Sequence, residues 1–146
     1  METKRYSPNF DRFYRLAIVL PTELVMLALT VTMAILEPTS LFYDIPVLLF
    51  VNYFVISPMT GYVELREEGL YIRFGFFMKR EIPYAKVRGI AKEHKFYADS
   101  MLALKGSLDH VNVKYNKFDL VSVSIKNTDE FIAELSERCG IKGDKI

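Results

Sequence analysis

The apolar residues of the chain fall into two long runs, and a region of alternating apolar and polar positions follows them. Residues 16–36 and 41–58 hold two charged side chains between them, Glu23 and Asp44. As a helix the first run would be about 32 Å long, enough to cross a hydrocarbon core of about 30 Å. The second run is uninterrupted from 45 to 57, so it would fit a slightly thinned bilayer. The pattern predicts two transmembrane helices, at about 16–36 and 41–58.

The stretch "EPTSLFYD", where the first run ends and the second begins, contains Pro38 and two acids and has no Lys or Arg. It is typical of a tight loop between antiparallel helices, so residues 1–60 are predicted to form a helical hairpin. Basic residues mark the cytoplasmic side of a span, and they occur before the first run and again after Pro58. We therefore expect a multi-pass protein of the cell membrane with both termini in the cytoplasm.

Two other structures could contain an apolar run of this kind. A cleavable signal peptide has a shorter apolar stretch followed by small residues at the cleavage site, and neither feature is present here. A soluble protein with two buried core helices is the remaining alternative. It is disfavoured because the polar remainder of the chain is too small to cover both helices.

Residues 61–146 alternate in the way that predicts a small β-rich domain. Glu67, Glu68 and Gly69 form a turn between two alternating strands, and Asn116-Lys117 forms a second turn further on. About seven short strands are expected, at these positions: 62–66, 70–74, a strand ending at Pro83, 87–94, 101–106, 111–115 and 120–125.

One amphipathic helix is predicted at the end of the chain, starting at Asn127 or Thr128 and stopping at Gly140. Its apolar positions form a single stripe at helical spacing, made of Phe131, Ile132, Leu135 and Cys139. Cys139 on this stripe is interpreted as a packed residue and not as a nucleophile.

Charge and chemistry exclude several classes of function. Both halves of the chain are close to neutral, with a net charge of +1 overall, whereas a nucleic-acid binder needs a strongly basic face. A single cysteine allows no internal disulfide. His94 and His110 lie in no metal-ligand motif, and no serine lies in a nucleophile motif. We expect no enzymatic activity, no metal and no cofactor.

Seven strands followed by one C-terminal helix resemble a PH-like barrel, in which the helix closes one end. The stretches "EGLYIRFGFFMKREIPYAKVRGI" and "MLALKGSLDHVNVKYNKFDLVSVSIKNTDEFIAEL" are similar to the YyaB-like bacterial PH-domain family, small membrane proteins with a cytoplasmic PH-like domain. The likeness covers Tyr62 to Leu135. One departure is Ile125, which stands where a Ser-Pro pair often precedes the family's helix. The predicted fold is thus a two-helix transmembrane hairpin followed by a mainly β, seven-stranded PH-like barrel capped by a helix.

Two groups of residues are candidates for function. The first is an apolar and basic stretch that could contact anionic lipid headgroups or a partner, and the alternative is that it fills and lines the barrel in the ordinary way. The second is a polar pair inside the predicted spans, Glu23 and Asn52. Glu23 needs a proton or a hydrogen-bonding partner, and we hypothesise that it faces Asn52 or an equivalent group on a second copy. The alternative is a carboxylate that is simply hydrated near the headgroups. The members of the first group are Phe76, Phe77, Met78, Lys79, Arg80, Lys86 and Arg88.

These features predict a membrane-anchored binding or scaffolding module without catalytic activity. The resemblance implies a role in envelope stress or in immunity to a membrane-active peptide. The alternative is an accessory subunit of a transport assembly that uses the polar residues within its spans. The partners expected are the membrane itself and a protein partner or a second copy, with no nucleic acid.

Overall fold

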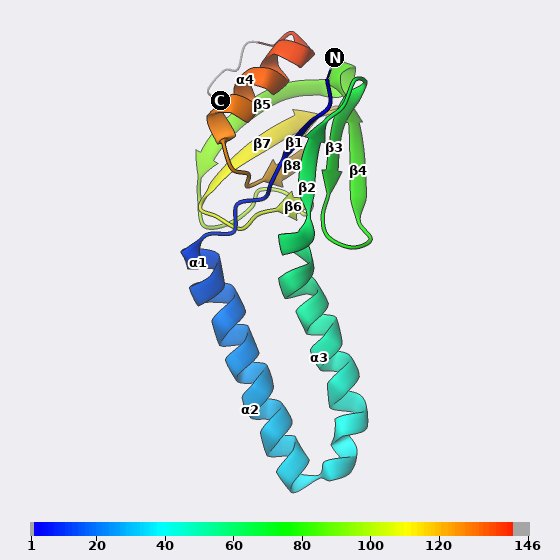
Figure 1. Cartoon of the computed structure of the whole chain (residues 1–146), viewed down its shortest axis with the longest axis vertical. Helices are drawn as coiled ribbons and strands as arrows, with labels where there is room; N and C mark the ends of the chain where they lie inside the picture. Colours follow the sequence, from blue (N-terminus) through cyan, green and yellow to red (C-terminus); the bar gives the residue numbers. More distant parts are fainter. Residues whose placement is uncertain (1, 142–146) are drawn as a thin grey trace.

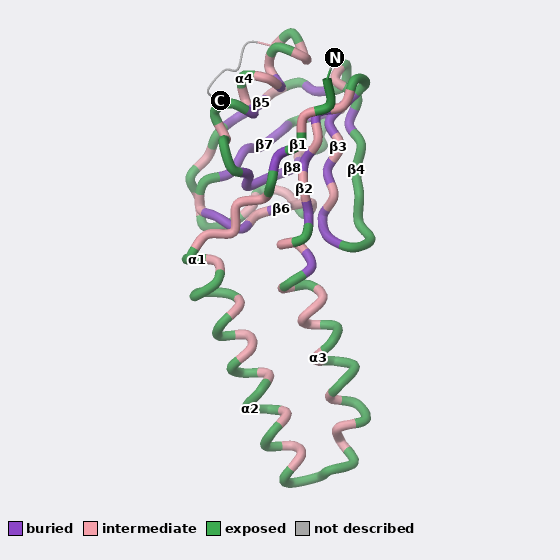
Figure 2. Tube along the Cα trace, viewed as in Figure 1, coloured by how far each residue is buried: buried purple, intermediate pink, exposed green. Residues whose placement is uncertain are grey.

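The computed structural model describes residues 2–141 and has two clearly different parts (Figure 1). Two long helices extend from one end of a β-rich domain, and a further helix lies at the opposite end of that domain. Buried residues are concentrated in the β-rich domain, whereas the two long helices are almost entirely exposed or half-exposed (Figure 2). This distribution is the one expected for helices whose solvent is lipid.

The first long helix consists of α1 (Arg12–Tyr14), a π-helical turn (Arg15–Val19) and α2 (Leu20–Leu36). Asp11 caps its start by accepting a hydrogen bond from the Tyr14 backbone N–H at 3.0 Å. Pro21 has no N–H to donate, and its ring crowds the carbonyl four residues earlier. The wider π-helical turn ends shortly before this proline and accommodates it, so the helix continues past Pro21.

The second long helix is α3 (Leu41–Ile56), with a 3-10 turn at each end (Pro38–Ser40 and Ser57–Thr60). The two helical stretches, Arg12–Leu36 and Pro38–Thr60, are long and apolar enough to cross a membrane. They contain the spans expected from the sequence. The Tyr14 hydroxyl donates a hydrogen bond to the Val55 carbonyl at 2.9 Å, which ties the two helices together where they meet the domain.

The β-rich domain consists of two four-stranded sheets, with strand orders β1-β2-β3-β4 and β5-β7-β8-β6. All neighbours pair antiparallel except β6 and β8, which are parallel. The strands are β1 (Lys4–Tyr6), β2 (Tyr62–Leu65), β3 (Gly69–Arg73), β4 (Lys79–Pro83), β5 (Val87–His94), β6 (Ala103–Leu104), β7 (Asp109–Tyr115) and β8 (Asp119–Val123).

The seven-stranded barrel predicted from the sequence is therefore corrected in two respects. The described residues contain an eighth strand, and the two sheets do not close into one barrel. A 3-10 turn (Tyr84–Lys86) stands between β4 and β5, which belong to different sheets. At the other edge, the segment after β1 reaches the second sheet through two isolated bridges, Pro8 with Ile125 and Phe10 with Gly106. Gly106 is required there because a Cβ would collide with the Phe10 ring.

The extra strand β1 comes from the segment before the first long helix. It pairs antiparallel with β2, placing Tyr6 opposite Val63. No pattern in the sequence predicts this strand, because three residues are too few to show alternation. The β-rich domain is thus assembled from residues on both sides of the helical hairpin.

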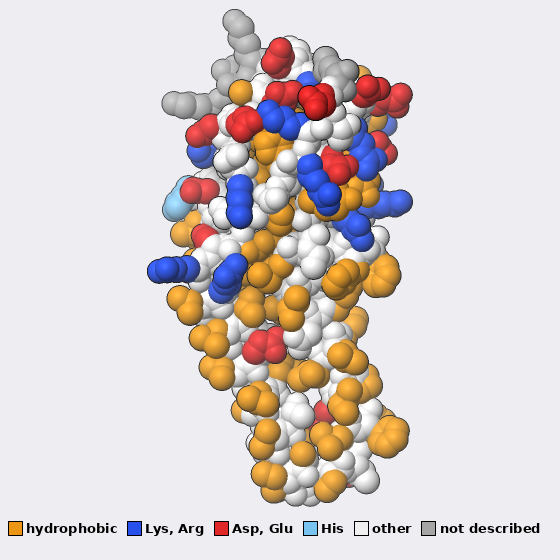
Figure 3. All heavy atoms as spheres, viewed as in Figure 1, with side chains coloured by type: hydrophobic (Ala, Val, Ile, Leu, Met, Phe, Trp, Pro, Cys, Tyr) orange, Lys and Arg blue, Asp and Glu red, His pale blue; other side chains and the backbone are white. Residues whose placement is uncertain are grey.

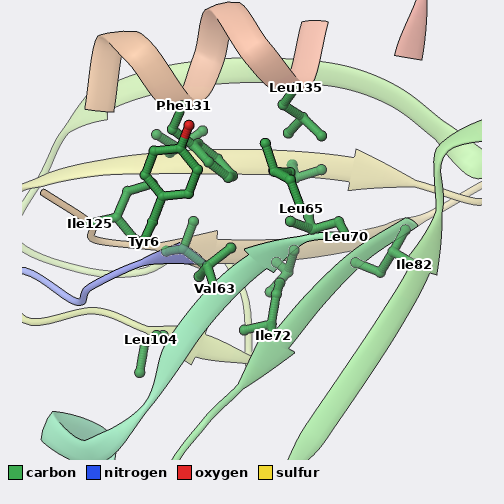
Figure 4. Packing of buried hydrophobic residues seen from close by; sticks show 14 of the residues in the cluster. Tyr6, Val63, Leu65, Leu70, Ile72, Ile82, Leu104, Ile125, Phe131 and Leu135 are labelled. Carbon is green, nitrogen blue, oxygen red and sulfur yellow. The ribbon is translucent and has the colours of Figure 1, made fainter. Parts of the chain in front are cut away.

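The core of the domain lies between the two sheets and beneath α4 (Thr128–Cys139). Phe131 and Leu135 of α4 are completely buried, and the Tyr6 ring meets the Phe131 ring edge to face at a centroid distance of 5.2 Å (Figure 4). The helix ends at Gly140 with a φ of 65°, as its sequence predicts. Cys139 is half-buried, and this burial raises the pKa of its thiol to about 11, so the thiol is protonated and unreactive at neutral pH.

Candidate functional site at the membrane interface

The turn between β3 and β4, residues 74–78 and here called the hairpin tip, is held against the end of α3. The Phe76 backbone N–H donates to Ser57 Oγ at 3.1 Å, and the Tyr53 ring lies 5.8 Å from the Phe77 ring. Gly75 has a φ of 127°, and a Cβ there would collide with Ser57. The hairpin tip is therefore fixed at the level where the second long helix enters the domain.

The hairpin tip exposes three large apolar side chains, Phe76, Phe77 and Met78, and Phe77 is 83% exposed. Phe74, in contrast, is buried in the core. Apolar side chains held at the end of a membrane span lie where the hydrocarbon meets the headgroups, and aromatic rings favour that region. This part of the sequence-predicted contact is thus suitably placed for a membrane.

A second loop, residues 95–102, exposes further apolar side chains at the same end of the domain. Phe96 packs edge to face on Phe13 of α1, with ring centroids 6.4 Å apart. Met101 lines a hollow of about 290 Å³ together with Tyr53 of α3 and Met78 of the hairpin tip. The loop therefore reaches both long helices. We call the exposed apolar side chains of this end the rim: Phe76, Phe77, Met78, Phe96, Tyr97 and Met101.

Sequence reasoning missed half of the rim, namely Phe96, Tyr97 and Met101. Their loop has no hydrophobic periodicity, so nothing in the pattern distinguishes an exposed aromatic residue from a buried one. The available signal was composition, since large apolar side chains in a charged loop after a strand are unusual unless they are covered.

The basic residues predicted to accompany this surface are divided between two ends of the domain. Lys79 and Arg80 are exposed and directly follow the hairpin tip. Lys86 and Arg88 are also exposed, but they come after Pro83 at the other end of β4, about 16 Å away along a five-residue strand. The structure brings Lys79 and Arg80 together with the rim and leaves the other two apart. Charged side chains are gathered over the domain, and apolar ones cover the helices (Figure 3).

A family model described as a bacterial PH domain matches residues 60–139, more than half of the chain. The chain belongs to the bacterial PH domain family. No curated protein and no solved structure matches it. The matched region runs from the end of the second long helix to the end of α4, so it contains the hairpin tip and the loop 95–102, while β1 of the PH domain lies outside it.

The polar residues of the spans lie beyond the PH domain. Asn52 Nδ2 donates to the Leu48 carbonyl of its own helix at 3.0 Å. Glu23 has a buried oxygen, Oε1, that accepts no hydrogen bond from the described residues. The structure therefore gives these two side chains different surroundings, and the pairing hypothesised from the sequence is not among the hydrogen bonds of the described chain.

Proposed function

We propose that this protein is a membrane-anchored binding module that holds its PH domain against the cytoplasmic surface of the cell membrane. Membership of the bacterial PH domain family supports a binding role, because PH domains are in general non-catalytic binding modules. The observation that carries the proposal is the rim, an exposed apolar surface at the end of the domain from which both apolar helices depart.

The free energies of the contacts that the rim can make with a membrane indicate its role. Complete burial of a Phe side chain contributes about 1.5–3 kcal/mol, and a basic residue near an anionic surface contributes about 1 kcal/mol. Two membrane spans already anchor the chain, so the rim, with Lys79 and Arg80 beside it, orients the domain rather than attaching it. An oriented domain presents its opposite end, which carries α4 and the β2–β3 turn, to a protein partner in the cytoplasm.

The spans also favour a partner inside the membrane. Neither α2 nor α3 buries any residue within the described chain, and Glu23 Oε1 lacks a hydrogen-bond donor. A second copy of the chain would supply both a helix surface and a donor. The finer role in envelope stress or immunity to a membrane-active peptide is supported by the YyaB-like resemblance alone.

The orientation can be measured with a single tryptophan, because the chain contains none. We expect a Phe77→Trp variant in liposomes to be strongly quenched by lipids brominated near the carbonyl end of their acyl chains, with blue-shifted emission. The reason is that the side chain at this position should lie at the base of the headgroups.

The matched control is Phe118→Trp, since Phe118 is 87% exposed. It lies in the β7–β8 turn, whose Asn116 backbone N–H donates to the Lys86 carbonyl at 3.0 Å, so it belongs to the end of the domain away from the rim. This control should show no quenching. Equal quenching at the two positions, or none at either, would contradict the proposal that the domain contacts the membrane through its rim.

A further inference from the structure

Three potential metal ligands meet at one end of the second sheet. Glu93 lies near the end of β5 and is directly opposite His110 on β7, while Asp99 comes from the loop 95–102. One side-chain ligand atom from each of the three residues lies within 4.8 Å of the other two. The sequence could not reveal this group, because its members are brought together by strand register and by a loop of irregular structure.

His110 is the member that points to a ligand. Its side chain is 0% exposed, and its Nδ1 lies 3.1 Å from the Leu108 carbonyl. That carbonyl can only accept a hydrogen bond, so Nδ1 carries the proton and Nε2 has a free lone pair. Nε2 is buried without a hydrogen-bond partner among the described residues 2–141 and lies 3.9 Å from Glu93 Oε2. In a metal-binding histidine, one ring nitrogen usually donates its N–H to a group such as a backbone carbonyl, and the other nitrogen binds the metal through its lone pair.

We propose that Glu93, Asp99 and His110 bind a divalent transition-metal ion of the Zn²⁺ type. One imidazole nitrogen and two carboxylate oxygens form a donor set that suits Zn²⁺, with water completing the coordination. Ligand bonds of about 2.0–2.2 Å in a tetrahedral arrangement place the donor atoms about 3.3–3.6 Å from one another. Small movements of the two half-exposed carboxylates are enough to reach this spacing.

Neighbouring side chains already hold the Asp99 carboxylate in place. Asn112 Nδ2 donates to Asp99 Oδ2 at 3.2 Å, and Ser122 Oγ donates to Asn112 Oδ1 at 2.5 Å. Both Asn112 and Ser122 are buried. Such outer hydrogen bonds orient metal ligands. Since Asp99 belongs to the loop that carries Phe96, Tyr97 and Met101, a metal ion here would also fix that part of the rim to the sheet.

One cation is already near the site. Lys95 Nζ lies 2.8 Å from Glu93 Oε2 and 3.2 Å from Asp99 Oδ2. At these distances the ammonium group occupies the same carboxylate oxygens that a metal ion would use, so the two compete for them. The proposal therefore predicts that removing this ammonium group strengthens metal binding, whereas a purely structural ion-pair network predicts no metal binding with or without it.

The test is a calorimetric Zn²⁺ titration of the full chain in detergent micelles, with any affinity tag removed. We expect one Zn²⁺ per chain, and we expect Asp99→Asn and Glu93→Gln each to weaken binding at least about tenfold. Lys95→Met should bind Zn²⁺ more tightly than the wild type. Because Asp99 and Glu93 are partly exposed, these variants keep the buried His110 and should melt close to the wild-type temperature.

The matched control is His94→Ala, which removes the chain's other histidine. His94 is exposed, and its Nδ1 lies 2.6 Å from Asp109. This variant should bind Zn²⁺ like the wild type. The proposal is overturned if neither wild type nor Lys95→Met binds Zn²⁺, or if His94→Ala weakens binding as much as Asp99→Asn does. Neither result would bear on the seating of the domain, which the tryptophan measurement tests separately.

Discussion

Glu23 is an ionisable residue within an apolar helix, and placing its charge in a bilayer has a free-energy cost. A charged group at the bilayer centre costs about 2.5–3.5 kcal/mol on insertion scales, and less toward the edge. Its Oε1 atom is buried and has no hydrogen-bond partner in the described chain, while Asn52 donates to its own helix. A proton on the carboxyl, a water molecule or a donor from a second molecule would satisfy this atom, and the proposed second copy of the chain is the source that can be tested.

Substitution of Glu23 tests this inference. Glu23→Gln retains hydrogen-bonding capacity and should preserve self-association, whereas Glu23→Leu should weaken it by about 1–2 kcal/mol, the range for polar contacts between model helices. The measurement is energy transfer between donor-labelled and acceptor-labelled copies in liposomes. Glu37→Gln, at the exposed end of the first long helix, is the control. Unchanged energy transfer in Glu23→Leu would assign Glu23 to lipid or water contact.

The residues at the two ends of α4 show which local features could be predicted from the sequence and which could not. Gly140 was predicted as the helix stop, and its left-handed backbone confirms it. Asn127 was predicted as one of two N-cap candidates and holds that position, but its own backbone is left-handed and its side chain makes no capping bond. The position follows from the local pattern, but the hydrogen bond near it is made by the other candidate, since Thr128 Oγ1 donates to the Ile125 carbonyl at 3.0 Å.

Among the helices and strands, those with a clear hydrophobic period could be predicted from the sequence, and the short ones could not. The β2–β3 hairpin around Glu67 and Glu68, the β7–β8 hairpin around Asn116, and α4 all appear where their patterns place them. In contrast, β1 is three residues long, and its role depends on a partner strand more than 50 residues away. Pairing over such distances leaves no local trace in the sequence.

The contribution of β1 can be measured on fragments of the domain. Residues 60–146 alone lack Tyr6, which is 4% exposed and packs on Phe131. A chain in which residues 1–11 are joined to 61–146 by a flexible linker restores it. We expect the free energy of unfolding of the linked chain, from urea denaturation, to exceed that of the fragment by about 3–5 kcal/mol, the cost of deleting a buried aromatic side chain.

Tyr6→Ala in the linked chain is the control, and it should lose most of that gain. Its backbone can still pair with β2, so the comparison separates side-chain packing from strand pairing. Equal stability of the fragment and the linked chain would show that the domain does not need the N-terminal strand, and that residues 60–146 fold alone as the sequence suggests.

In the molecule as a whole, the division into apolar helices and a polar domain was evident from composition, whereas the arrangement of the domain's end beside the helices was not. The hairpin tip was recognisable because it follows an alternating strand and contains consecutive apolar residues. The rest of the rim, and the separation of Lys86 and Arg88 from it, depend on which strand ends lie beside the helices. That arrangement is a property of the sheet topology and not of any one segment.

If two spans hold the PH domain on the cytoplasmic side of the membrane, the turn between the long helices and the β7–β8 turn lie on opposite sides, and cysteine labelling can distinguish these sides. In a Cys139→Ala background, one cysteine replaces Thr39, which is exposed in the turn between the long helices, and another replaces Lys117, which is exposed in the β7–β8 turn. We expect a membrane-impermeant thiol reagent to label Thr39→Cys in intact cells and Lys117→Cys solely in inside-out vesicles. The reverse pattern, or labelling of both variants in intact cells, would contradict this membrane topology.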